Sequence, residues 1–112
     1  MSGLLAGNLL TDVPAGSPDE RIDTLLAHPG ARIERIVSTG QASPEGFWYD
    51  QEEDEFVVLI SGAAGLRLEG EDVRVLAPGD WLHIPAHCRH RVDWTAPEEP
   101  TVWLAIFLPA AG

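Results

Sequence analysis

Apolar and polar residues alternate along most of the chain after residue 30, in short runs that Gly and Pro separate. In residues 66–69 the leucines point to one side and the charged residues to the other, which is typical of a half-buried strand. Residues 56–60 and 102–108 are apolar at almost every position, as in strands that are covered on both faces. Several short strands at regular spacing predict an all-β sandwich or barrel.

One segment near the N-terminus has the pattern of a helix instead. Ser17, Pro18 and Glu20 resemble a helix start, with a capping hydroxyl, a proline at the first helical position and a glutamate that completes a capping box. Three apolar residues would then share one helical face: Ile22, Leu25 and Leu26. We therefore expect a short helix of about 10 residues that ends at a Pro-Gly pair.

The predicted organisation is a single domain over residues 1–112, which is long enough for one hydrophobic core. An apolar, extended arm and the short helix would occupy residues 1–30, and the barrel would occupy residues 31–109. Strands that are apolar on both faces need an outer cover, which the short helix, the N-terminal arm or a second subunit could supply. Because one short helix is little cover, we expect a homodimer.

Most of the imidazole chemistry lies in residues 79–94, which hold three of the four histidines. His90, Val92 and Trp94 share one face of a predicted strand, so His90 points the same way as apolar residues. His83 and His87 lie at neighbouring strand ends, where several imidazoles could face one cavity. Imidazole is the commonest protein ligand of divalent transition metals, although a lone inward histidine is more often a hydrogen-bonded core residue.

An acidic group at residues 50–55 precedes the apolar run that begins at residue 56. Most of it is expected to be a solvated turn. Glu55 differs, because it has the parity of Val57 and Leu59 in the same predicted strand. It is therefore predicted to face inward with them.

The charge and cysteine content narrow the classes of partner. The formal net charge is -11, from 18 acidic and 7 basic residues, so binding to a nucleic acid backbone is disfavoured by repulsion. The single cysteine, Cys88, cannot form an internal disulfide. No apolar stretch approaches membrane-spanning length, and residues 1–15 lack the basic start of a secretion signal. We expect a cytoplasmic protein without nucleic-acid or membrane partners.

Two motifs in this order resemble those of the cupin superfamily, in its small single-domain form. Gly79, Pro85 and His90 have the spacing of the second cupin motif, and Glu55 and Gly62 match the end of the first. The resemblance covers roughly residues 33–108. It implies a jelly-roll barrel, also called a double-stranded β-helix, whose interior commonly binds one metal ion.

The sequence departs from these motifs at several positions. In the second motif, His87 stands in place of a glycine and Trp94 in place of an asparagine. In the first, the two histidine positions fall on Tyr49 and Gln51, or on Trp48 and Asp50, depending on the spacing.

The metal site that the resemblance implies is thus reduced to Glu55 and His90, with Asp50 or Gln51 as a further ligand. The expected ion is a divalent metal, Mn, Fe, Ni, Cu or Zn. The alternative is that Glu55 and His90 form a buried hydrogen-bonded pair in a barrel without metal.

Three functions are compatible with this reading. The first is a metal-dependent enzyme that acts on a small polar metabolite, of isomerase, dioxygenase or decarboxylase type, with Tyr49 or His87 as the catalytic proton-transfer group. The second is a non-catalytic barrel that binds a small molecule between aromatic walls. The third is a structural dimer with a vestigial site.

Overall fold

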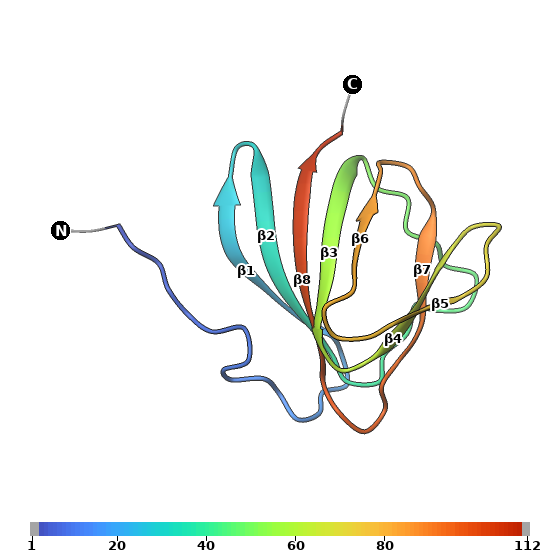
Figure 1. Cartoon of the computed structure of the whole chain (residues 1–112), viewed down its shortest axis with the longest axis horizontal. Coiled ribbons are helices and arrows are strands. Elements are labelled where there is room, and N and C mark those ends of the chain that lie inside the picture. The colour runs from blue at the N-terminus through green and yellow to red at the C-terminus, as the bar shows by residue number, and fades with distance from the viewer. Residues whose placement is uncertain (1–2, 111–112) are drawn as a thin grey trace.

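The computed structural model describes residues 3–110, and in this part of the chain eight strands form two antiparallel sheets (Figure 1). The larger sheet has the order β1-β2-β8-β3-β6 and the smaller one the order β5-β4-β7. The strands are β1 (Arg21–His28), β2 (Ala31–Ser38), β3 (Glu53–Ser61), β4 (Ala64–Leu68), β5 (Arg74–Leu76), β6 (Trp81–Ile84), β7 (His90–Thr95) and β8 (Thr101–Pro109). The prediction of an all-β fold is confirmed. The first two and last two residues of the predicted domain lie outside the described residues.

The predicted N-terminal helix is wrong, because its residues form β1 and residues 3–110 contain no helix. β1 pairs with β2 from Arg21 opposite Val37 to His28 opposite Ala31, so the Pro-Gly pair makes a hairpin turn rather than a helix end. The register shifts between Thr24 and Leu26. This irregularity interrupts the period-two alternation of the strand, which explains why its apolar residues imitate a helical face.

The hydrophobic core lies between the two sheets and contains alternate residues of β3 and β8. Val57 and Leu59 of β3 pack with Trp103, Ala105 and Phe107 of β8 in one cluster of buried residues, which also contains residues of β4, β5 and β6. The strands predicted from these two apolar runs are therefore confirmed, and their inward residues are the ones that build the interior.

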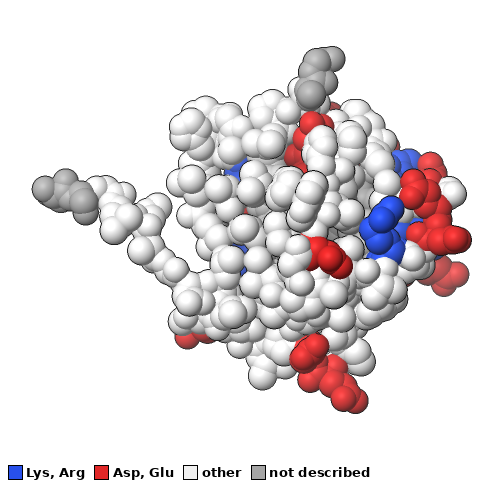
Figure 2. Space-filling view, viewed as in Figure 1, with Lys and Arg blue, Asp and Glu red and all other residues white. Residues whose placement is uncertain are grey.

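The other face of the five-stranded sheet is mostly apolar over β3 and β8, and it carries charged residues at its β1–β2 end, where Arg35 and Asp23 lie. Phe56 stacks on Trp81 with ring centroids 5.2 Å apart, and the Trp81 residue is 61% exposed. Figure 2 shows this face, with few charged side chains over β1, β2, β8 and β3, whereas acidic and basic residues gather around the β4–β5 turn. A covering was predicted for this face.

Part of that covering is the N-terminal arm. Its described residues, from Gly3 onward, join neither sheet, and Arg35 of β2 holds them by donating hydrogen bonds to the carbonyl groups of Leu9 and Thr11, at 3.2 and 2.7 Å. Arg35 is also paired with Asp23 of β1, at 2.7 Å. The start of the arm runs away from the sheets (Figure 1), and Leu4 and Leu5 are exposed. No helix of residues 3–110 is long and apolar enough to cross a membrane.

Candidate functional site

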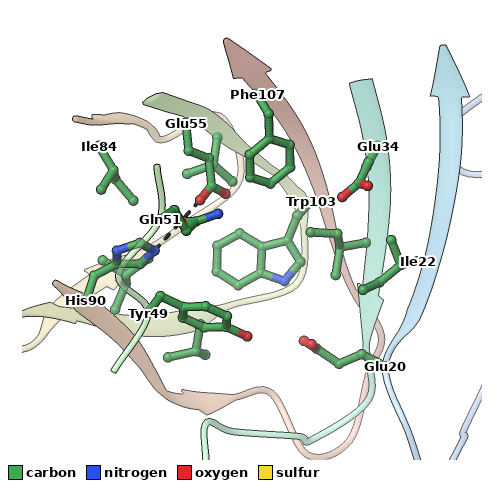
Figure 3. Close-up of a pocket in the computed structure, with 14 residues that line it drawn as sticks. Glu20, Ile22, Glu34, Tyr49, Gln51, Glu55, Ile84, His90, Trp103 and Phe107 are labelled. Carbon is green, nitrogen blue, oxygen red and sulfur yellow. Dashed lines mark ion pairs between the residues drawn. The ribbon is translucent and has the colours of Figure 1, made fainter. Parts of the chain in front are cut away.

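The interior between the two sheets contains a cavity of about 160 Å³ (Figure 3). Its walls are mostly aliphatic and aromatic, with Trp103 and Phe107 contributed by β8. The polar side chains that line it come from several elements and are Glu20, Glu34, Tyr49, Gln51, Glu55 and His90. A mainly apolar cavity with a few convergent polar groups is typical of a small-molecule site.

Glu55 of β3 and His90 of β7 lie next to each other in the wall of this cavity. The distance from His90 Nε2 to Glu55 Oε1 is 3.7 Å, and both residues are buried. His90 Nδ1 lies 2.8 Å from the carbonyl oxygen of Cys88. Because a carbonyl can only accept, Nδ1 carries a proton and Nε2 is the atom that faces Glu55. The two motif residues predicted to share the site are therefore brought together.

The environment of His90 favours its protonated form. Burial lowers the pKa of the imidazole, but the Glu55 carboxylate and the Cys88 carbonyl both raise it, and the net pKa is above the usual value. A histidine with a raised pKa beside a carboxylate can hold and release a proton near neutral pH.

Tyr49 lies beside His90 because the two residues form an isolated antiparallel bridge. The Tyr49 amide donates to the His90 carbonyl at 2.7 Å, and the two rings are stacked with centroids 5.3 Å apart. Burial raises the pKa of the Tyr49 hydroxyl, and the charges of Glu20 and Glu55 raise it further. Tyr49, predicted as a proton-transfer group, is thus a neutral phenol at the cavity wall.

Gln51 lines the cavity, whereas Asp50 does not. The Asp50 carboxylate instead lies 2.7 Å from His87 Nδ1, and both side chains are at least half exposed. His87 has φ 61°, a left-handed conformation that suits the glycine expected at this position of the motif. The predicted catalytic residue His87 and the predicted ligand Asp50 therefore form a surface pair that does not line the cavity.

The three histidines near the second motif do not converge. His83 of β6 is opposite Phe56 in the sheet, and its ring lies 3.4 Å from Asp54, with about half of the side chain exposed. Only His90 of the three lines the cavity. The expectation that several imidazoles share one cavity is therefore wrong, because His83 has the outward parity of Phe56 and His87 lies in an exposed loop.

The donor set does not fit a conventional transition-metal site. Within residues 3–110, no group of three or more His, Cys, Asp or Glu side chains is arranged to hold a metal ion. Glu55 and His90 are two suitable donors, and Gln51 could add an amide oxygen, which is a weak ligand for late transition metals. A protein site for such metals generally supplies three or four nitrogen, sulfur or carboxylate donors.

Two lining residues, Glu20 and Glu34, were not predicted as part of the site. Glu34 has the same parity on β2 as Ile36, which also lines the cavity, so the strand alternation contained a signal for it. Glu20 was assigned to a capping box, and only the formation of β1 brings it to the cavity.

Comparison with known proteins supports the resemblance to cupins that the two sequence motifs indicated. The family model for the Cupin domain matches residues 29–107. The chain belongs to the cupin family.

Solved structures of other cupins support the fold in detail. A protein from Ralstonia eutropha JMP134, described as a "putative mannose-6-phosphate isomerase", is 58% identical, with a TM-score of 0.94 over 96% of this chain and 100% of that one. A cupin superfamily protein from Desulfitobacterium hafniense DCB-2 is 18% identical, with a TM-score of 0.72 over 87% of this chain and 84% of that one. An RmlC-like cupin from Methanocaldococcus jannaschii with a double-stranded β-helix fold is 15% identical, with a TM-score of 0.69 over 84% of each chain. No curated protein matched.

This cupin therefore has the double-stranded β-helix fold that the resemblance implied, with its first strand in place of the predicted helix. The similarity to the last two structures concerns the fold alone, because fold does not determine function.

Proposed function

We propose that this cupin binds a small polar molecule in the cavity between its sheets, in contact with Glu55 and His90. The observation that carries the proposal is the placement of this buried pair in the wall of an otherwise mainly apolar cavity. Burying a carboxylate and an imidazole has a free-energy cost, so their position in an open cavity is better explained by a ligand than by stability.

The same residues can support proton transfer on a bound molecule. His90 presents Nε2 toward Glu55, and the pair can share one proton that either residue passes to a ligand. Tyr49 at the cavity wall can donate a hydrogen bond from its neutral hydroxyl. Isomerisation of a hydroxy carbonyl compound requires a base and an acid of this kind, and the Ralstonia relative is described as an isomerase.

A metal-dependent enzyme is the second candidate, because the resemblance to cupins implies a metal and His90 has the tautomer of a metal ligand. Its Nδ1 is bonded to a carbonyl, which leaves Nε2 free to coordinate. Glu55, His90 and Gln51 would then hold a divalent ion, Mn, Fe, Ni, Cu or Zn, that supplies Lewis-acid chemistry. We favour the metal-free reading because only two of these three residues are strong ligands.

The binding proposal is tested by nuclear magnetic resonance with a panel of small polar fragments. Trp103 lines the cavity, so a bound fragment should shift the resonance of its indole N–H. Glu55→Gln should weaken fragment binding, whereas His83→Asn, a histidine change on the other side of the sheet, should leave it unchanged. If no fragment shifts Trp103, the cavity is not a binding site and the proposal fails.

Elemental analysis of chelator-free protein separates the two candidates. About one equivalent of a transition metal, lost in both Glu55→Gln and His90→Asn and retained in His83→Asn, would establish the metal-dependent reading. Metal-free protein that binds fragments, and that binds them equally well after each ion is added back, would support the metal-free one.

The cytoplasmic location, the homodimer and the absence of nucleic-acid and membrane partners stay predictions.

A further inference from the structure

The charged side chains that line the cavity are mostly carboxylates. Glu20, Glu34 and Glu55 surround it from different elements (Figure 3), and no Arg or Lys of residues 3–110 is among the lining residues. We propose that the ligand of this cavity is a small organic cation, such as a substituted ammonium compound, an inference that rests on the proposed function.

The carboxylates are held in place by the surrounding structure. Trp103 Nε1 donates to the Ser38 hydroxyl at 3.2 Å, and this hydroxyl, fully buried, donates in turn to the Glu20 carboxylate. Glu34 accepts a hydrogen bond from Arg32 Nε at 3.0 Å. Side chains that are already fixed lose little conformational entropy when a ligand binds, so the negative groups are preorganised.

The charges around the cavity leave a negative excess. Arg32 is paired with Glu34, and also with Glu53 at 3.2 Å, so it has no surplus charge to offer an anion. Even with His90 protonated, Glu20 and Glu55 together outweigh it by one negative charge. A monocation would neutralise the site, whereas a phosphate group would be repelled by it.

The aromatic walls suit a cation as well. Tyr49, Trp103 and Phe107 line the cavity, and the faces of aromatic rings attract positive charge. The guanidinium of Arg32, which does not line the cavity, lies 4.4 Å from the Phe107 ring centroid, so this ring already takes part in a cation–π contact. The cavity of about 160 Å³ is close to the size of an engineered cavity of about 150 Å³ that binds benzene. It therefore suits a ligand of that size rather than a whole sugar phosphate.

Choline and its neutral carbon isostere, 3,3-dimethylbutan-1-ol, provide a matched test because they differ in charge and not in shape. Isothermal titration calorimetry should give an affinity for choline at least about tenfold higher than for the alcohol, and both should shift the Trp103 indole resonance. The choline affinity should also fall with added salt. Equal binding of the two probes, or tighter binding of mannose 6-phosphate or inorganic phosphate than of choline, would overturn the inference.

Variants distinguish the charge contribution from the cavity itself. Glu20→Gln and Glu34→Gln should each weaken choline binding several-fold and leave the affinity for the alcohol unchanged. The control is Glu69→Gln, which alters an exposed carboxylate paired with Arg89 and should change neither affinity. If both probes bind equally in the cavity, the cationic ligand is excluded while the proposed function stands. If neither these probes nor any fragment shifts Trp103, the proposed function fails too.

Discussion

The two faces of the five-stranded sheet differ in chemistry although they are built from alternate residues of the same strands. On β3, Glu55, Val57 and Leu59 point into the barrel, while Phe56 and Val58 point outward. The inner face contributes carboxylates and aromatic walls to a cavity that His90 of the smaller sheet completes. The outer face is mostly apolar over β3 and β8 and is exposed at Trp81, with charged residues at its β1–β2 end, where Arg35 pairs with Asp23. The inner face has the composition of a ligand site and the outer face that of a surface to be covered.

We expect the outer face to be covered by a second copy of this chain. Few charged side chains are visible over β2, β8 and β3 in Figure 2, and the N-terminal arm, whose Leu4 and Leu5 are exposed, extends beyond the sheet toward where a partner molecule would lie. An isologous pair would bury the same apolar patch on both copies. Four experiments test this difference between the two faces and the stability of the loop beside them.

The largest effect is expected on the inner side. Leu59 is 1% exposed, so Leu59→Ala should lower the free energy of unfolding by about 2–5 kcal/mol, through lost burial and a residual cavity. Val58→Ala, the neighbouring outward residue, should cost about 1 kcal/mol or less at protein concentrations too low for a dimer, and more where the dimer forms. Chemical denaturation at several protein concentrations measures both. A Val58→Ala effect that does not change with concentration would contradict a dimer through the outer face.

The second-largest effect is expected on the oligomeric state. Light scattering after size-exclusion chromatography should give twice the chain mass of 12.1 kDa for the unaltered protein. Trp81→Glu places a charge on the apolar outer face and should reduce the mass to that of one chain, because an unpaired charge is costly to bury. Arg74→Glu, at the exposed end of the smaller sheet, is the control and should remain a dimer. A single-chain mass for the unaltered protein would refute the homodimer.

A smaller effect is expected in the pH dependence of stability, through the pair of Glu55 and His90 in the cavity wall. The pKa of His90 is raised in the folded protein, so its contribution to stability is complete below the unfolded pKa of about 6.5 and is lost as the pH rises through the folded value. The free energy of unfolding should therefore fall as the pH rises through this range. Unfolding curves at a series of pH values, together with an NMR titration of His90, measure the dependence.

Two variants separate His90 from the other histidines in that experiment. Glu55→Gln should lower the pKa of His90 and flatten the dependence, because it removes the carboxylate that favours the imidazolium. His83→Asn, on the outer face, should leave the curve unchanged. An NMR titration in which the His90 pKa lies at or below its usual value would contradict the prediction.

The smallest effect is expected at His87, which is exposed in the loop between β6 and β7. Replacing His87 with glycine should relieve the strain of the left-handed conformation, which raises the free energy of unfolding by about 1 kcal/mol. The loss of the pair with Asp50 should lower it by up to about 1 kcal/mol. We expect a net gain in thermal stability that is small or close to zero. Asp50→Asn removes the charge pair but keeps the left-handed conformation at His87, so the melting temperature of this variant should fall slightly. A marked loss of stability in His87→Gly would show that the pair matters more than the strain.

The sequence predicted most of the barrel and part of its site. The strands after residue 30 follow the alternation and the Gly and Pro turns, and the spacing of Glu55 and His90 within two motifs predicted their meeting. The alternation and the turns are local features of the sequence, and the two motifs carry the resemblance to cupins. The cupin family and the all-β fold could be predicted for this reason.

What the sequence alone could not determine depends on pairing between distant segments. Residues 21–28 have helical signals, but pairing with β2 makes them a strand, and this strand connection brings Glu20 to the cavity. The bridge between Tyr49 and His90 fixes the register that turns Gln51 rather than Asp50 inward. A shift of one residue would exchange the two, and no local preference opposes such a shift. Propensity and spacing thus determined the strands after residue 30, whereas the tertiary structure determined the first strand and which side chains join Glu55 and His90 at the cavity.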